Sequence, residues 1–333
     1  MTTIAPAKVG LILFSHGSLL CGAGAILDTH VQRLQESQRF TIATAGYLNY
    51  SEPPIEVAVE RCTAAGVDHV VIVPYFLVAG KFVREDLPKR LAELRAGAAA
   101  NVKISMARAV EDAPAMLDLV LSLSRQGADP AAWQGGAIRK ARQQCELRES
   151  CPLYGSSMCR ASMLISDAAS AMAQEPPADQ HPPLRSGLGG DTRAQRGLLL
   201  VLHGSPRPEA NLPALEIAAK IRAGAGARTC TPSNEAACAR TNISYVETAY
   251  LECNEPSIPL ALDNAAAAGV THLDVVPYFL HPGRHLVLDI PGHIADSRAR
   301  NPHMEIAICP PVGETTALTE ILLQRALESL QSP

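Results

Sequence analysis

Short hydrophobic runs alternate along most of the chain with segments whose hydrophobic residues recur every three or four positions. In the first 127 residues the runs are rich in β-branched residues and bounded by turn signals, which predicts strands, and the segments between them have helical spacing. The predicted strands are VGLILF (9–14), FTIATAGY (40–47), HVVIVPYF (69–76) and VKISMA (102–107). The predicted helices are AILDTHVQRLQ (25–35), PIEVAVERCTAA (54–65), EDLPKRLAELRA (85–96) and APAMLDLVLSLS (113–124).

The same order of segments returns in the last third of the chain. LFSHGS (13–18) recurs as LVLHGS (200–205), and AAGVDHVVIVPYFL (64–77) recurs as AAGVTHLDVVPYFL (267–280). The segment between these two matches is longer in the second copy. Its extra residues fall between the first predicted helix and the second predicted strand, where residues 223–242 are rich in Gly, Ala and Asn, as expected of an exposed insertion. Because nearly continuous apolar strands alternate with helices, each copy is expected to be an α/β unit with a four-stranded parallel sheet flanked by helices.

Three regions are therefore expected. Residues 1–127 form copy 1 and residues 197–333 form copy 2. Residues 128–196 separate them: a helical segment that contains cysteines is followed by a Pro- and Gly-rich polar stretch typical of a flexible linker.

Composition excludes several classes of partner. The formal net charge of the 333 residues is −4 and the arginines are scattered, so we expect no nucleic acid partner. No apolar run approaches the roughly 18–20 residues that cross a bilayer, and the N-terminal sequence lacks a secretory pattern, so we expect no membrane partner. Nine cysteines, most of them single within apolar segments, favour a reduced, cytoplasmic protein.

The residues at the predicted strand tips distinguish the two copies. Ligands of open parallel sheets bind beyond the carboxyl ends of the strands, where three shared segments fall. At these tips copy 2 carries His203, Glu252 and His285, whereas copy 1 carries His16, Asn49 and Phe82. Two imidazoles and a carboxylate can hold a divalent metal with open positions or accept protons, and an amide with a phenyl ring can do neither.

Each of these residues also has an ordinary structural interpretation. A single histidine after a strand is more often a hydrogen-bonded structural group than a catalyst, and Glu252 alone could cap a helix or form a salt bridge. The joint pattern favours a functional site, because three ionisable residues fall on three tips and two of them are missing together from the other copy.

Three segments of copy 2 resemble a known family. HGS after the first strand, AYLECNEPSIPLAL after the second and PYFLHPGRHLVLDIP after the third resemble the sirohydrochlorin cobaltochelatase/ferrochelatase family. The family comprises class II tetrapyrrole chelatases, and the two copies of this chain resemble its long two-copy form of the CbiX/SirB type. The resemblance implies two tandem chelatase-like domains. It implies that His203 and His285 are the active-site histidines and that Glu252 is the carboxylate that assists with the metal, while copy 1 is degenerate and forms the other wall of the cleft.

The activity implied by the resemblance is insertion of Co²⁺ or Fe²⁺ into sirohydrochlorin with release of two protons, in cobalamin or siroheme biosynthesis. Imidazoles, with a reference pKa of about 6.5, suit proton uptake from the macrocycle. The alternatives are a non-catalytic carrier of metal or tetrapyrrole, and a chelatase for nickel or another porphyrinoid. The metal is the substrate, and the chain is expected to work as a monomer or a homodimer.

Sirohydrochlorin is a polycarboxylate, so its site should offer cations and N–H groups. Candidates are Ser205, Arg207 and Arg284 in copy 2, with Lys81 and Arg84 across the cleft. For either copy 2 arginine an ordinary surface charge is the alternative. His281 is either an exposed loop residue or a group that passes metal inward.

Cys145, Cys151 and Cys159 are spaced C-x5-C-x7-C, and a proline follows Cys151. They are candidate ligands of an iron–sulfur cluster, because a proline sometimes follows such ligands. The spacing matches no standard motif and a fourth ligand is not evident, so three incidental thiols are the alternative.

Overall fold

The computed structural model describes residues 8–17, 24–97, 99–125, 195–224, 243–281 and 285–331. Copy 1 contains β1 (Val9–Ser15), α1 (Ala25–Glu36), β2 (Ile42–Tyr47), α2 (Ile55–Ala64), β3 (His69–Pro74), the π-helix η1 (Phe82–Asp86), α3 (Leu87–Ala96), β4 (Lys103–Met106), the 3-10 helix η2 (Val110–Asp112) and α4 (Ala115–Arg125). Copy 2 contains β5 (Arg196–Leu202), the 3-10 helix η4 (Pro208–Asn211), α7 (Leu212–Arg222), β6 (Ile243–Tyr250), α8 (Ile258–Ala267), β7 (His272–Pro277), the π-helix η6 (His285–Asp289), α9 (Ile290–Arg300), β8 (Glu305–Ile308), the 3-10 helix η7 (Val312–Glu314) and α10 (Thr316–Gln331).

Each copy forms its own four-stranded parallel sheet, as the sequence predicts. The strand orders are β2-β1-β3-β4 and β6-β5-β7-β8. The central strands β1, β3, β5 and β7 are rich in Val, Ile and Leu and are buried on both faces, whereas the edge strands β2, β4, β6 and β8 are partly exposed. In both sheets the first strand lies between the second and the third. The strand order therefore reverses between the two central strands, and ligands of such sheets usually bind at the carboxyl ends of the strands that flank this point.

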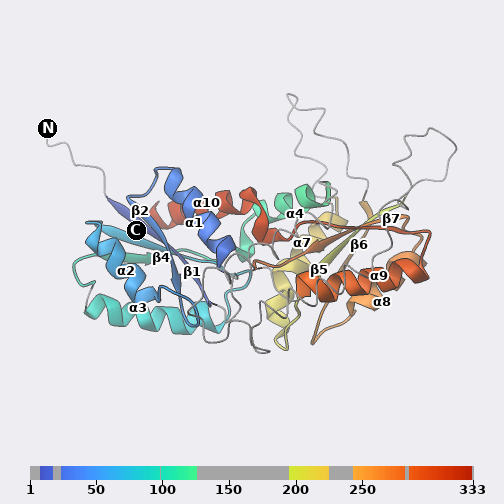
Figure 1. The fold of residues 1–333 in the computed structure, drawn as a ribbon, viewed down its shortest axis with the longest axis horizontal. Helices are drawn as coiled ribbons and strands as arrows, with labels where there is room; N and C mark the ends of the chain where they lie inside the picture. The colour runs from blue at the N-terminus through green and yellow to red at the C-terminus, as the bar shows by residue number, and fades with distance from the viewer. Residues whose placement is uncertain are drawn as a thin grey trace, which may run out of the picture.

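The last helix of each copy packs on the sheet of the other copy. Helix α10 lies against β3, β4 and α1 of copy 1, and α4 lies against β7 and α7 of copy 2 (Figure 1). The α10 residue Ser329 donates to Ser105 of β4 at 3.1 Å, and Arg196 of β5 donates to the carbonyl of Ser124 in α4 at 2.9 Å. The two copies thus exchange their terminal helices.

This exchange produces one hydrophobic core that runs through both copies. The inner faces of the two sheets and helices α1, α4, α7 and α10 contribute to it, with Leu11, Leu119, Leu200 and Leu322 among its fully buried residues. Two smaller clusters fill the outer faces, one beneath α2 and α3 and the other beneath α8 and α9. Because the largest core is shared, the two sheets hold each other in place.

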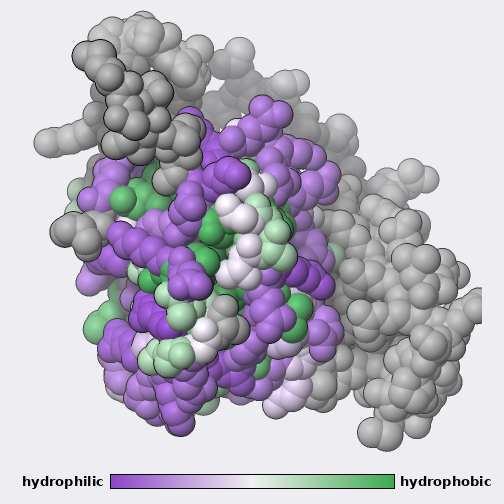
Figure 2. All heavy atoms as spheres, turned by 90° about the vertical axis from the view of Figure 1, so that its left-hand side faces the viewer, coloured by the Kyte–Doolittle hydropathy of each residue, from purple (hydrophilic) through white to green (hydrophobic). Residues whose placement is uncertain are grey.

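Hydrophilic side chains dominate the outer end of copy 1, with smaller groups of hydrophobic residues between them (Figure 2). None of the helices in the described part of the chain has the length and hydrophobicity that a membrane span requires. The predicted insertion at 223–242 and the region 128–196 lie mainly or wholly outside the described residues.

Candidate metal site at the strand tips of copy 2

His203, Glu252 and His285 come together although they lie far apart in the sequence. His203 follows β5, Glu252 follows β6, and His285 begins the π-helix after β7. Their candidate ligand atoms all lie within 4.8 Å of one another, and within the described ranges they are the one such set of His, Cys, Asp and Glu side chains. His203 and Glu252 are exposed and His285 is half-buried, so an ion in solution can reach the set.

Gly204 allows the first two tips to approach. Its φ is +89°, and a Cβ at this position would lie 1.9 Å from the carbonyl oxygen of Glu252. The amide of Glu252 donates to the carbonyl of His203 at 3.0 Å. Asn254 adds a second link, because its Oδ1 accepts from the amide of Ser205 at 2.7 Å and from Nδ2 of Asn211 at 3.0 Å. Only glycine permits this backbone contact, which places His203 beside Glu252.

His285 is positioned by a neighbour that the sequence patterns did not single out. Nδ1 of His285 lies 2.7 Å from Oδ2 of Asp289, one turn further along. A carboxylate on one imidazole nitrogen fixes the ring and leaves the other nitrogen available to a metal. In the sequence, the only sign of this contact is that Asp289 follows His285 by four residues in a segment with helical spacing. Aspartates near helix starts are so common that this spacing alone does not identify a functional residue.

The two imidazoles are arranged to share an ion. Their ring centroids lie 5.1 Å apart and their planes are nearly perpendicular, at 84°. Nδ1 of His203 lies 3.3 Å from the carbonyl oxygen of Gly204, so in both rings Nδ1 has an oxygen partner and Nε2 is left to act as a ligand. Two nitrogens and one carboxylate oxygen make a three-ligand set that leaves coordination positions open on a bound divalent metal.

Copy 1 keeps the backbone of this site without its ligands. Gly17 has a φ of +85° and approaches the carbonyl of Asn49, as Gly204 approaches Glu252. His16 there faces aromatic rings, with its centroid 4.5 Å from that of Phe82 and 5.7 Å from that of Tyr50. The described part of copy 1 therefore holds no equivalent three-ligand set.

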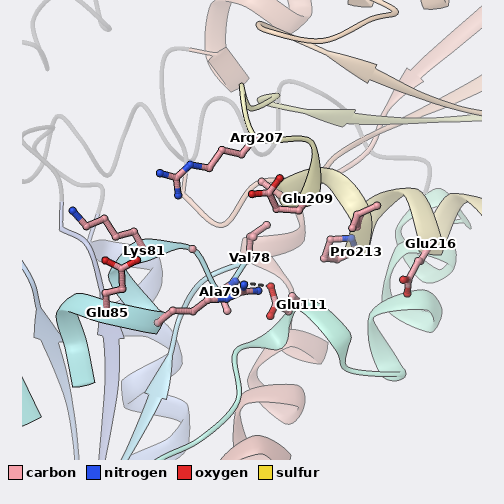
Figure 3. Close-up of a pocket in the computed structure, with 13 residues that line it drawn as sticks. Val78, Ala79, Lys81, Glu85, Glu111, Arg207, Glu209, Pro213 and Glu216 are labelled. Atoms are coloured by element: carbon pink, nitrogen blue, oxygen red, sulfur yellow. Dashed lines mark hydrogen bonds between the residues drawn. The ribbon is translucent and has the colours of Figure 1, made fainter. Parts of the chain in front are cut away.

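A pocket of about 380 Å³ lies between the copies, and His203, Glu252 and His285 are not among the residues that line it. Lys81 and Arg84 line it from copy 1, and Arg207, four residues after His203, lines it from copy 2 (Figure 3). Glu85, Glu111, Glu209 and Glu216 also line it, so its charge is mixed. The amide of Arg207 donates to Oγ of Ser205 at 3.1 Å, which makes Ser205 part of the loop that carries this arginine.

The remaining predicted site residues are Arg284, the three cysteines and His281. Arg284 and the cysteines Cys145, Cys151 and Cys159 lie outside the described residues, so the iron–sulfur site stays a prediction. His281 is neither in the ligand set nor simply exposed. Its Nε2 lies 3.3 Å from Oγ of Ser15, and its ring meets the edge of Tyr75 with centroids 5.2 Å apart, so it contacts copy 1.

A sequence model of the CbiX family matches residues 10–126 and 197–329, which covers both copies. The chain belongs to the CbiX family. Among curated relatives, this CbiX chain is 31% identical over 83 residues to the sirohydrochlorin cobaltochelatase of Methanopyrus kandleri, or 25% of this chain and 58% of that protein. It is 30% identical over 129 residues to the chloroplastic sirohydrochlorin ferrochelatase of Arabidopsis thaliana, or 39% of this chain and 50% of that protein. The alignments thus span 58% and 50% of the length of these two relatives.

A third relative is aligned over nearly its whole length. The sirohydrochlorin cobaltochelatase of Sulfurisphaera tokodaii is 31% identical over 136 residues, which is 41% of this chain and 95% of that protein.

The fold of this CbiX chain resembles SirB from Bacillus subtilis with Fe³⁺, at a TM-score of 0.64 and 15% identity over 97% of this chain and 96% of that one. A SirB structure in complex with cobalt gives a TM-score of 0.58 at 15% identity, over 98% and 97%. At this identity the likeness establishes the fold of the CbiX chain.

Proposed function

We propose that this protein is a sirohydrochlorin chelatase that inserts Co²⁺ or Fe²⁺ into the macrocycle and releases two protons, in cobalamin or siroheme biosynthesis. The observation that carries the proposal is the convergence of His203, Glu252 and His285 within 4.8 Å in copy 2. The names of the relatives support the substrate, because cobaltochelatases and a ferrochelatase for sirohydrochlorin are among them.

The three ligands hold the substrate metal before transfer. Cobalt and iron both accept imidazole nitrogen and carboxylate oxygen, and a three-ligand set leaves coordination positions for the pyrrole nitrogens. The half-buried His285, oriented by Asp289, and the exposed His203 offer Nε2 from different strand tips. As the four macrocycle nitrogens take over the ion, the protein ligands are released one after another.

Proton balance gives the same groups a second task. A divalent ion replaces two pyrrole N–H protons, so two protons leave for each ion inserted. The imidazole nitrogens of His203 and His285, freed from the metal, are suited to accept them, and the carboxylate of Glu252 is suited to relay a proton to solvent. No change of oxidation state is involved, so the reaction needs no redox partner.

The carboxylates of the macrocycle require cations around the metal site. Arg207, four residues after His203 in the sequence, supplies one, and Lys81 with Arg84 supply others from the facing copy. Ser205 orders the Arg207 loop, and Arg284 directly precedes His285 in the sequence. Arginine binds carboxylates with two parallel hydrogen bonds, so these residues can fix the orientation of the macrocycle above the ion.

Metal insertion followed by absorbance tests the proposal. His203→Ala and His285→Ala should each lower the insertion rate by at least about 100-fold, the scale expected when a group that moves protons or metal is removed. His303→Ala is a matched control, because His303 is exposed in the turn before β8, at the opposite end of the sheet. If both site variants insert metal at the wild-type rate, the protein is not a chelatase of this kind.

Two further measurements separate the alternatives. A carrier would bind metal or tetrapyrrole without accelerating insertion over the uncatalysed reaction, so wild-type protein at catalytic amounts distinguishes it from an enzyme. Competition among Co²⁺, Fe²⁺ and Ni²⁺ for sirohydrochlorin identifies the preferred ion. The cytoplasmic setting and a monomeric or dimeric state belong to the same proposal, since two copies in one chain already supply both walls of a site.

A further inference from the structure

The strand tips of copy 1 carry an exposed aromatic cluster, formed by His16, Tyr50 and Phe82, where copy 2 carries metal ligands. Tyr50 is 63% exposed and Phe82 is 38% exposed, although both are large apolar side chains. The His16 ring lies between them, with centroids 5.7 Å and 4.5 Å away and tilts of 52° to each. Large aromatic side chains that lie together and exposed on a surface typically mark a binding surface.

Tyr50 occupies a backbone conformation that few side chains adopt. Its φ is 60°, in the left-handed region, and Cys253 at the matching place in copy 2 has a φ of 65°. The tip geometry is thus common to both copies, while the side chain differs. A bulky residue in this conformation is uncommon and points to a functional reason for the position.

Sequence neighbours of the aromatic cluster and of the metal ligands meet between the two copies. Lys81 and Arg84, on either side of Phe82, line the pocket opposite Arg207, which follows His203 by four residues. Ser15, next to His16, lies 3.3 Å from His281, which precedes His285 by four residues. Neighbours of the aromatic cluster therefore contact or oppose neighbours of the metal ligands at two independent places.

We infer that the His16–Tyr50–Phe82 cluster is the stacking surface that holds the flat tetrapyrrole against the metal ligands. This inference rests on the proposed function. Aromatic faces bind a planar conjugated ring by offset stacking, and contact through the ring face leaves the central nitrogens free to receive the metal from the opposite side. The cationic neighbours Lys81 and Arg84 suit carboxylates at the rim of such a ring. Copy 1 thus lacks the metal ligands of copy 2, and its strand tips bind the macrocycle instead of the metal.

The test uses the full-length chain and two separate titrations. Metal-free sirohydrochlorin is titrated by absorbance to measure its binding, and Co²⁺ alone is titrated by the visible spectrum of the bound ion. Phe82→Ala and Tyr50→Ala should each weaken sirohydrochlorin binding and raise its KM by roughly 5- to 10-fold. Co²⁺ binding should not change, which also shows that the variants are folded. Phe82→Trp should restore binding, whereas Phe82→Leu should not.

Leu260→Ala is the matched control, because Leu260 is 47% exposed on α8, which covers the outer face of the copy 2 sheet. It removes an exposed apolar side chain and should leave both titrations unchanged. Wild-type affinity for sirohydrochlorin in both Phe82→Ala and Tyr50→Ala would overturn the inference, even if His203→Ala still abolishes insertion. If wild-type protein fails to bind sirohydrochlorin at all, the proposed function fails and this inference fails with it.

Discussion

The ring centroid of Phe82 lies 4.5 Å from that of His16, and the copy 2 counterparts His285 and His203 are 5.1 Å apart. The two copies thus hold their first and third strand tips at nearly the same separation. Asp86 also stands four residues after Phe82, as Asp289 stands four residues after His285. Copy 1 therefore retains the framework of the candidate site in copy 2 and lacks two of its three side chains.

Restoring those two side chains should create a second metal site. In the double variant Asn49→Glu with Phe82→His, we expect about two Co²⁺ ions per chain, compared with one in the wild type, because the backbone already positions all three tips. Equilibrium dialysis with metal analysis measures the stoichiometry. Each single variant should stay at one ion, and a double variant that also stays at one would show that the two frameworks are not equivalent.

Asp289 should act on the metal through His285. Asp289→Asn is expected to weaken Co²⁺ affinity by about 10- to 100-fold, because the neutral amide holds and polarises the imidazole less well. Calorimetric titration measures the affinity. Asp86→Asn is the matched control, since it makes the same change before α3, where Phe82 offers no nitrogen. Equal affinities in the two variants would mean that the 2.7 Å contact does not affect the metal.

Much of this fold follows from the sequence, and the exceptions have physical reasons. Apolar runs predict the four strands of copy 1 and helical spacing predicts the helices between them, and the repeated segments extend the same order to copy 2. The exchange of α4 and α10 could not be predicted from the sequence, because an amphipathic pattern shows that Leu119 or Leu322 is buried without showing which sheet it packs against. The strand tips were predictable since parallel strands end at one edge. Asp289 was missed because its role appears only once His285 begins a π-helix and turns Nδ1 towards it.

Gly204 should be needed for both stability and metal binding. A Cβ there would meet the Glu252 carbonyl oxygen at 1.9 Å, whereas at Gly269, with a similar φ of +80°, the nearest neighbour is a side-chain atom of Gln195 at 3.6 Å. Gly269→Ala should therefore cost about 1–2 kcal/mol of the free energy of unfolding, from backbone strain alone. Gly204→Ala should cost about 1–3 kcal/mol more and also reduce Co²⁺ affinity, because the clash separates His203 from Glu252.

Denaturant unfolding and Co²⁺ titration of the two glycine variants separate these effects. The difference between the two losses in stability isolates the steric clash from the strain of a positive φ. If Gly204→Ala matches Gly269→Ala in stability and keeps wild-type Co²⁺ affinity, the close approach of the first two tips is not what builds the site.

Protonation of His30 at acidic pH should weaken the packing of α10 on copy 1 and so lower the free energy of unfolding. It lies in α1 and is buried, with Nε2 2.9 Å from the carbonyl oxygen of Gly313 and Nδ1 2.8 Å from Oγ1 of Thr319 in α10. Burial lowers the pKa of His30 to about 4, and the charges of Arg33 and His281 act in the same direction. The unfolded chain, with an ordinary histidine pKa of 6.5, therefore binds more protons than the folded chain between these values.

The free energy of unfolding should consequently fall as the pH drops from about 6.5 towards 4, by roughly 3 kcal/mol from this residue. Denaturant unfolding at a series of pH values measures the slope. His30→Gln can keep one hydrogen bond to α10 but has no titrating ring, so its slope should be shallower even if its stability at pH 7.5 is lower. The exposed His303→Gln should follow the wild-type slope. Parallel curves for the wild type and His30→Gln would show that burial at the exchanged helix does not suppress protonation of His30.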